Sequence, residues 1–93
     1  MSNVYYNPRD FGLEIVAEIE YSTGSYEFDT RVIWKDEEGR LWTARDSGCS
    51  CPTPFENESL DTLERLVKEE VIAEAIKELN AGANDFIKEV KAL

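Results

Sequence analysis

The stretch that decides the fold is LEIVAEIEY, residues 13–21, in which apolar side chains alternate with glutamates. Alternation with a period of two residues is typical of a β-strand that is buried on one face. The predicted core face consists of Leu13, Ile15, Ala17, Ile19 and Tyr21. The predicted solvent face carries Glu14, Glu18 and Glu20, with Val16. This stretch therefore predicts a half-buried strand.

Two further strands are predicted directly downstream. Residues 26–35, YEFDTRVIWK, alternate again, and residues 40–45, RLWTAR, follow the turn sequence DEEG. Short connections between such strands favour antiparallel hairpins. We therefore predict a three-stranded antiparallel meander over residues 13–46, with one apolar face that needs a cover.

The register of the second hairpin depends on Gly39. If Gly39 is left-handed after a type I turn, Trp34 lies opposite Trp42. A four-residue loop would instead set Trp34 against Leu41. We prefer the first register because it gathers both tryptophans on the core side of the sheet.

From Ser59 onward the apolar pattern becomes helical. Ser59 is a plausible N-cap, and Gly82 reads as a left-handed terminator. The apolar stripe consists of Leu60, Leu63, Val67, Val71, Ala75 and Leu79, and Ile72 and Ile76 widen it. We therefore expect one long helix of roughly 20 residues, followed by a short helix that starts at Asn84 or Asp85 and ends near Leu93.

These elements predict a single α+β domain over residues 1–93, in which the meander packs against a long C-terminal helix and a short second helix. Its expected parts are an aromatic lead-in over 1–12, the meander over 13–46, a Cys/Pro loop over 47–58 and a helical region over 59–93. Tyr5, Tyr6 and Phe11 are expected to pin the lead-in to the body. The apolar stripe is wider than a short sheet can cover, so the helical region could also support a homodimer.

Charge limits the classes of partner. The chain has 20 acidic and 10 basic side chains and no histidine, for a net charge of −10. Such a surface repels phosphate backbones and anionic membranes, so we expect neither direct nucleic-acid binding nor membrane docking. It suits high solubility, which we favour, attraction to a basic protein partner, or mimicry of nucleic acid. No signal peptide or membrane span is recognisable, which predicts a cytoplasmic protein.

The sequence DSGCSCP, residues 46–52, is the candidate recognition loop. Its members are Asp46, Ser47, Gly48, Cys49, Ser50, Cys51 and Pro52. Two thiolates at this spacing can bind a soft metal, with Asp46 as a third ligand or with a second chain across a dimer, or can exchange disulfides. Because the chain has no histidine and the loop no basic residue, we favour two small thiols that shape a tight loop. We expect no metal and no cofactor.

No set of residues predicts catalysis. Without histidine, no serine or cysteine has the usual activating base. The acidic residues of the first two strands are predicted to lie on a solvated sheet face, near Arg31 as a counter-charge. We predict that the protein is not an enzyme.

Several motifs together resemble those of a protein family. They are Tyr5-Tyr6-Asn7-Pro8, Phe11-Gly12-Leu13, Tyr26-Glu27-Phe28-Asp29, Trp34-Lys35-Asp36, the DSGCSCP loop and Pro54-Phe55-Glu56. Over about residues 5–58 the chain resembles small actinobacteriophage proteins of the mycobacteriophage type, a family without an assigned activity. The resemblance implies a phage gene expressed in a bacterial host cytosol, and it transfers no catalytic residue.

We therefore predict a non-enzymatic, acidic phage protein that binds a host or phage protein. One alternative is a metal or thiol-redox role of Cys49 and Cys51. The other alternative is mimicry of nucleic acid by the acidic surface.

Overall fold

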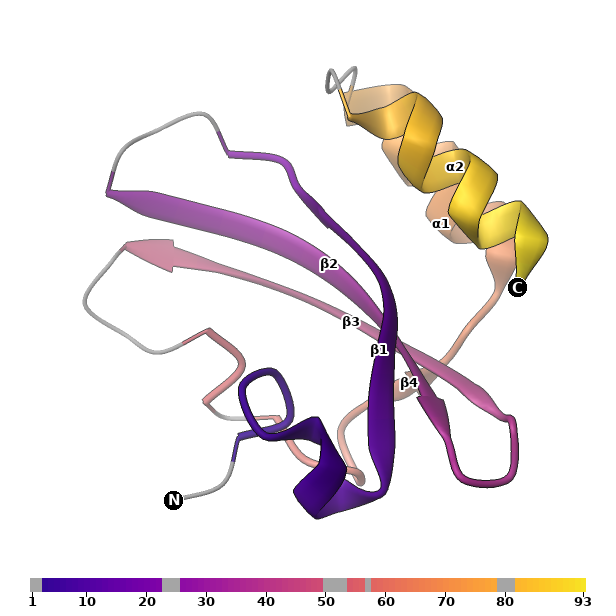
Figure 1. Ribbon diagram of the computed structural model, residues 1–93. Helices are drawn as coiled ribbons and strands as arrows, with labels where there is room; N and C mark the ends of the chain where they lie inside the picture. The colour runs from indigo at the N-terminus through magenta and orange to yellow at the C-terminus, as the bar shows by residue number, and fades with distance from the viewer. Residues whose placement is uncertain (1–2, 23–25, 50–53, 57, 79–81) are drawn as a thin grey trace.

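The computed structural model describes residues 3–22, 26–49, 54–56, 58–78 and 82–93 (Figure 1). In chain order the elements are the 3₁₀ turn η1 (Pro8–Phe11), the strands β1 (Leu13–Glu20), β2 (Glu27–Asp36), β3 (Leu41–Cys49) and β4 (Glu64–Arg65), and the helices α1 (Lys68–Glu78) and α2 (Ala83–Ala92). An antiparallel sheet and two helices make this an α+β fold, which confirms the predicted class.

The predicted hairpin register is confirmed. Trp34 pairs with Trp42 across β2 and β3, and Gly39 is left-handed with φ of 84°. The Asp36 backbone N–H donates to the carbonyl of Arg40 at 2.9 Å and closes the turn. The preference for placing both tryptophans on one side of the sheet therefore selected the correct register, and the left-handed turn residue is a glycine, which adopts that conformation without strain.

The sheet has four strands in the order β1-β2-β3-β4, so the prediction of three strands was wrong. The fourth strand is short. Glu64 and Arg65 pair antiparallel with Thr43 and Trp42 of β3. The Leu66 N–H extends this pairing by donating to the Leu41 carbonyl at 3.0 Å. β4 falls within the region where the apolar pattern predicted helix.

The long helix predicted from Ser59 was also wrong, because α1 begins at Lys68. Residues 60–62 form a turn instead, and the Ser59 carbonyl accepts the N–H groups of Thr62 and Leu63. Leu63 packs against one face of the sheet, whereas Val71 of α1 packs against the other. The chain must therefore pass the sheet edge between them, and a continuous helix would prevent that crossing.

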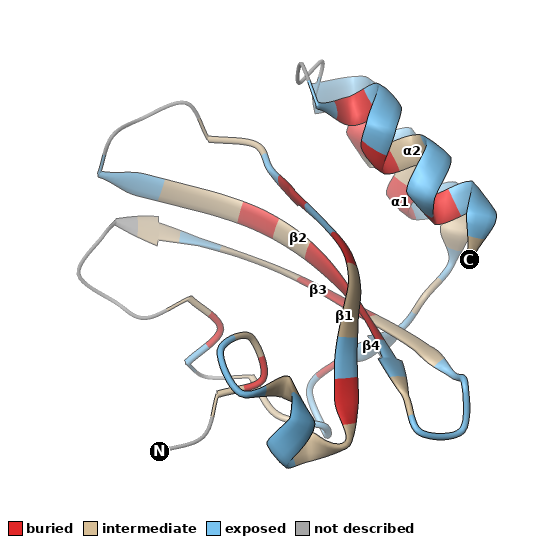
Figure 2. Ribbon diagram, in the orientation of Figure 1, coloured by how far each residue is buried: buried red, intermediate tan, exposed pale blue. Residues whose placement is uncertain are grey.

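Both faces of the sheet are covered (Figure 2). The helix-side cluster consists of Ala17, Ile19, Ile33, Val71, Ala75, Ala83, Phe86 and Val90. The loop-side cluster consists of Val4, Leu13, Val32, Trp34, Ala44, Phe55 and Leu63. The expectation of one core face and one solvent face is therefore corrected. With a core on each side, the sheet becomes the middle layer of the domain.

A β-bulge in β1 makes this arrangement possible. The register with β2 shifts between Ile15 and Ala17, so Val16 is an extra residue. Leu13 and Ile15 therefore face the loop side, whereas Ala17 faces the helices. An inserted residue reverses the alternation of side chains beyond it. The five apolar residues predicted to share one face are split between two.

The two helices are of similar length, with 11 residues in α1 and 10 in α2, so the expected contrast of long and short is corrected. In Figure 1, α2 runs back alongside α1. Gly82 is the N-cap of α2 with φ of −87°, and is not the left-handed terminator that we predicted. No helix among the described residues has the length and apolar character that crossing a bilayer requires.

The lead-in is held by Val4 and by part of its aromatic set. Val4 is fully buried, and its carbonyl accepts the indole N–H of Trp34 at 2.9 Å. Tyr5 and Phe11 pack against the loop-side cluster, as predicted. Tyr6 is 60% exposed and does not pin the segment.

Candidate interaction surface

The predicted recognition loop begins inside a strand. Asp46, Ser47, Gly48 and Cys49 belong to β3, which corrects the expected start of the loop at residue 47. The Cys49 side chain and Ser50, Cys51 and Pro52 lie outside the described residues. Within the described part of the chain, no group of three acidic or thiol side chains is placed to hold a metal ion.

Asp46 closes this loop at its base. Its carboxylate accepts the backbone N–H of Phe55 at 2.8 Å. Phe55 has a left-handed backbone, with φ of 61°, and its buried ring stands at 89° to that of Trp34, with centroids 5.6 Å apart. Tyr5 packs on the same ring, with centroids 5.4 Å apart. The Asp46 carboxylate therefore ties the backbone of Phe55 to β3, which fixes where the chain returns to the core after the loop.

The glutamates of the first two strands are exposed, as predicted, but two of them also bond to other parts of the protein. Glu18 lies on the loop side, where it accepts the Tyr5 hydroxyl at 3.3 Å. Glu20 accepts the Thr30 hydroxyl at 2.8 Å and the Asp29 backbone N–H at 2.6 Å. The burial of Tyr5 and the neighbouring charge of Glu18 raise the pKa of Tyr5 to about 12. These carboxylates are bonded to the body of the protein.

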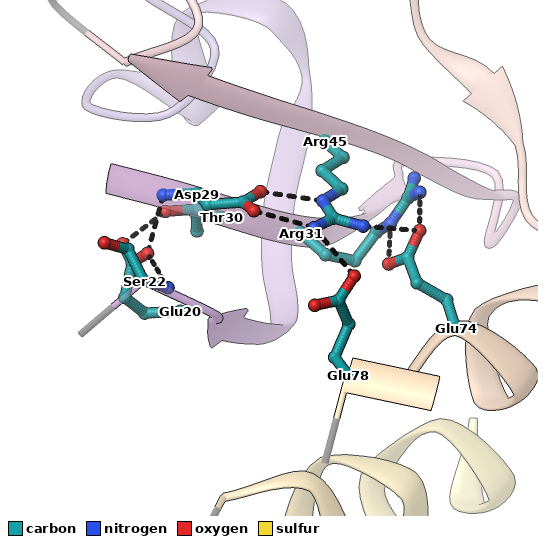
Figure 3. A network of polar contacts seen from close by, with 8 residues as sticks. All are labelled: Glu20, Ser22, Asp29, Thr30, Arg31, Arg45, Glu74 and Glu78. Carbon is teal, nitrogen blue, oxygen red and sulfur yellow. Dashed lines mark hydrogen bonds and ion pairs between the residues drawn. The ribbon is translucent and has the colours of Figure 1, made fainter. Parts of the chain in front are cut away.

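An ion-pair network joins α1 to the sheet (Figure 3). Arg31 of β2 makes two bonds with Glu74, at 2.9 and 2.6 Å. Arg45 of β3 makes two bonds of 2.7 Å with Asp29 and one of 3.2 Å with Glu78. The predicted counter-charge Arg31 is thus present, but it pairs with a helix residue rather than with the strand carboxylates.

The pKa shifts in this network indicate that it stabilises the fold. The bonds from Arg45 hold the pKa of Asp29 below its usual value, against the effect of its partial burial. Burial raises the pKa of Glu74, but the bonds from Arg31 outweigh it and leave the pKa lowered. The Tyr21 hydroxyl is buried beside Glu74. Its burial, and to a lesser extent the negative charge of Glu74, raise the pKa of Tyr21. Asp29 and Glu74 are both held in the charged form, which suits a fixed ion pair.

A second cluster lies at the end of the β2–β3 hairpin, around Trp42. The Asp36 carboxylate accepts the Trp42 indole N–H at 3.0 Å and the Arg40 guanidinium at 2.7 Å. Burial raises the pKa of Asp36, but these bonds and those from the turn backbone hold it well below its usual value. The Arg65 guanidinium carbon lies 5.1 Å from the centroid of the Trp42 ring. Trp42 is only half-buried, unlike Trp34, which is fully buried.

Two adjoining hollows flank this cluster. The Trp42 hollow, of about 360 Å³, is lined by Phe11, Glu37, Glu38, Arg40, Trp42 and Leu60. The Lys35 hollow, of about 410 Å³, is lined by Arg9, Leu13, Glu14 and Lys35. Both hollows also share Gly12, Asp36 and Glu37 as a common wall. Both hollows are open to solvent rather than enclosed, so they suit a surface contact with a partner.

Glu37 stands between the two hollows. Gly12 is left-handed, with φ of 70°, and a Cβ atom there would lie 3.5 Å from Cδ of Glu37. With the described residues Glu37 makes neither a hydrogen bond nor an ion pair, whereas its neighbours Asp36 and Glu38 both pair with Arg40. A carboxylate without such a bond in the wall of a hollow is available to a partner.

The sequence contained only a partial signal for this surface. The acidic turn beside Trp42 was visible, but Trp42 was expected to be a core residue and Leu60 to belong to a helix. In the structure Leu60 is 48% exposed at the hollow. Phe11 reaches the same place from η1. The hollow is therefore built by three segments that are far apart in the sequence.

The structure limits which apolar side chains of the helical region could form the expected homodimer contact. Of the predicted apolar stripe, Leu63, Val71 and Ala75 are buried, whereas Leu60, at the Trp42 hollow, and Val67 are 48% and 45% exposed. Ile76, which widens the stripe, is 58% exposed. Self-association through the helical region remains a prediction, with Val67 and Ile76 as the exposed apolar side chains at which it would occur.

The fold and this surface define a small α+β domain whose central sheet is covered by a helical hairpin on one face and by irregular chain on the other. The chain belongs to the family described as a domain of unknown function, DUF7574, whose model matches residues 2–91. No match was found among curated proteins or solved structures.

Proposed function

We propose that this protein is a non-enzymatic binding module that holds a protein partner at the Trp42 hollow and the adjoining Lys35 hollow. The observation that carries the proposal is the pair of hollows with a common wall, next to a half-buried Trp42 and an exposed Leu60. Aromatic residues in partly exposed grooves are typical anchors of protein interfaces.

The shifted carboxylate pKa values support a binding role over acid–base catalysis. Asp29, Asp36 and Glu74 all have lowered pKa values because arginines or turn N–H groups bond to them. A general acid needs the opposite shift, toward neutral pH. Carboxylates held in the charged form suit ion pairing.

The distribution of charge supports a basic partner. Residues 1–66 carry 14 acidic and six basic side chains, whereas residues 67–93 carry six and four. The excess therefore belongs to the sheet and its loops, which include both hollows. Complementary charge speeds association and selects partners. A phage origin and a partner in the bacterial host cytosol belong to this proposal on the strength of the sequence resemblance.

The test is affinity capture from host lysate with a matched pair of variants. Leu60→Lys places a positive charge in the Trp42 hollow, where it would repel a basic partner, whereas Ile76→Lys places one at a comparably exposed apolar position on α1. We expect a saturable partner that Ile76→Lys retains and Leu60→Lys loses, and we expect calorimetry with the purified partner to give the same order. Failure to capture a saturable partner, or loss with Ile76→Lys alone, would contradict the proposed surface.

A further inference from the structure

The Trp42 hollow combines an apolar wall with a carboxylate rim. Phe11, Trp42 and Leu60 supply the apolar part, and Glu37 and Glu38 lie at the same hollow. A surface of this kind matches a side chain that has an aliphatic stem and a charged head. Lysine and arginine are the residues with that form, because they bury the stem along apolar surface and keep the head at polar groups.

The sign of the head group follows from the charges in the wall. Among the described residues that line the hollow, Asp36, Glu37 and Glu38 are opposed by one cation, Arg40, whose guanidinium pairs with Asp36 at 2.7 Å and with Glu38 at 3.1 Å. Glu37 is left without an ion pair among the described residues. An acidic side chain would be repelled here, and a wholly apolar one would remove water from Glu37 without replacing its hydrogen bonds.

The chain itself shows that this region accommodates guanidinium groups. Arg65 and Arg40 lie 5.1 and 6.0 Å from the centroid of the Trp42 ring. Both distances are those of cation–π contacts. Because Arg40 and Arg65 already lie beside the indole, we expect the charged head of an incoming side chain to lie at the Glu37 carboxylate instead.

We infer that the Trp42 hollow binds the side chain of one arginine or lysine of the protein partner, with its stem against Trp42 and Leu60 and its head at Glu37. This inference rests on the proposed function, because it specifies the chemistry of the partner at the same surface. The partner is thereby identified as a protein that presents a basic side chain on an exposed segment.

The two tryptophans make the inference testable by NMR on the full chain. The Trp42 indole N–H bonds to Asp36 at the hollow, whereas the Trp34 indole N–H bonds to the Val4 carbonyl in the core. The probes are N-acetyl-arginine amide and N-acetyl-lysine amide, and N-acetyl-citrulline amide supplies nearly the same shape as the arginine probe without the charge. We expect saturable shifts of the Trp42 signal alone, with a Kd on the order of 1 mM, and weaker binding of citrulline.

Variants separate the local effect of Glu37 from the effect of net charge. Glu37→Gln and Glu89→Gln each remove one negative charge, and Glu89 lies on α2, away from the hollow. We expect Glu37→Gln to weaken binding of the arginine probe roughly two- to fivefold and Glu89→Gln to leave it unchanged. Equal effects of the two variants, equal binding of citrulline, or the lack of a saturable shift would each overturn the inference.

The result is distinguishable from a failure of the proposed function. One outcome is a captured partner whose binding depends on Leu60, while the basic probes leave the Trp42 signal unchanged. That result would support the proposed binding module and contradict the inferred basic side chain. If the basic probes bind at Trp42 but Leu60→Lys loses no partner, the site binds basic side chains but the proposed docking surface is wrong.

Discussion

At Phe55 the backbone takes a left-handed conformation, with φ of 61°. For a residue with a side chain this conformation costs about 1–2 kcal/mol. The buried ring against Trp34 and the N–H bond to Asp46 keep it there. Turn chemistry revealed the left-handed Gly39 in the sequence, but nothing local marks Phe55, because its conformation is imposed by contacts with residues far along the chain.

Substitutions at Phe55 test this balance. Phe55→Ala should lower the free energy of unfolding by about 3–5 kcal/mol, because it leaves a cavity beside Trp34. Phe55→Gly leaves a similar cavity but relieves the backbone, so it should be more stable than Phe55→Ala by about 1 kcal/mol. Urea denaturation followed by tryptophan fluorescence measures both values. If the free energy of unfolding of the alanine variant is equal to or higher than that of the glycine variant, the left-handed conformation of Phe55 carries no cost in stability.

At the scale of elements, α1 is attached to the sheet by charge as well as by apolar packing. Glu74 bonds to Arg31 of β2 and lies 3.3 Å from Arg45 of β3. The Glu74 and Arg31 side chains are mostly buried, so each depends on the other for hydrogen bonds. Helical periodicity predicted a helix here but could not predict the ion-pair partners of Glu74. Arg31, for example, lies 43 residues before Glu74 in the sequence.

Removing the Glu74 charge should loosen the helical layer. Glu74→Gln leaves Arg31 and Arg45 with a weaker partner, and we expect it to lower the free energy of unfolding by about 1–2 kcal/mol. Amide hydrogen exchange should accelerate in α1 before it accelerates in β2 and β3. Glu78→Gln is the matched control, because Glu78 makes one bond of 3.2 Å to Arg45 and is more exposed. Equal losses from the two variants would argue against a central role for Glu74.

At the scale of the molecule, stability should fall at both ends of the pH range. The pKa values of Asp29, Asp36 and Glu74 are lower in the folded chain than in the unfolded one. Their contribution is present above about pH 4, the unfolded value, and is lost as pH falls through the folded values. Tyr5 has the opposite shift, to a pKa of about 12, so its contribution is present below about pH 10 and is lost as pH rises toward 12.

Thermal denaturation between pH 2 and 12 measures this dependence. We expect a plateau between about pH 5 and 9 that declines on both sides. Asp36→Asn should lower the plateau and reduce the decline on the acid side, because one of the three depressed carboxylates is gone. Tyr5→Phe should reduce the decline on the alkaline side. An acid limb that Asp36→Asn leaves unchanged would exclude Asp36 as a source of acid sensitivity.

The sequence by itself determined the features that depend on near neighbours. Alternation predicted β1 and β2, and the change of period predicted a helical C-terminus. The DEEG turn allowed two registers, and the preference for both tryptophans on one side predicted the observed pairing of Trp34 with Trp42. Only the tertiary structure decided which residues face which core, where α1 begins and where a fourth strand forms. The physical reason is that the chain covers both faces of one sheet. The bulge at Val16 and the crossing at β4 follow from that packing, and the Trp42 hollow is assembled where the lead-in, the hairpin and the crossing segment meet.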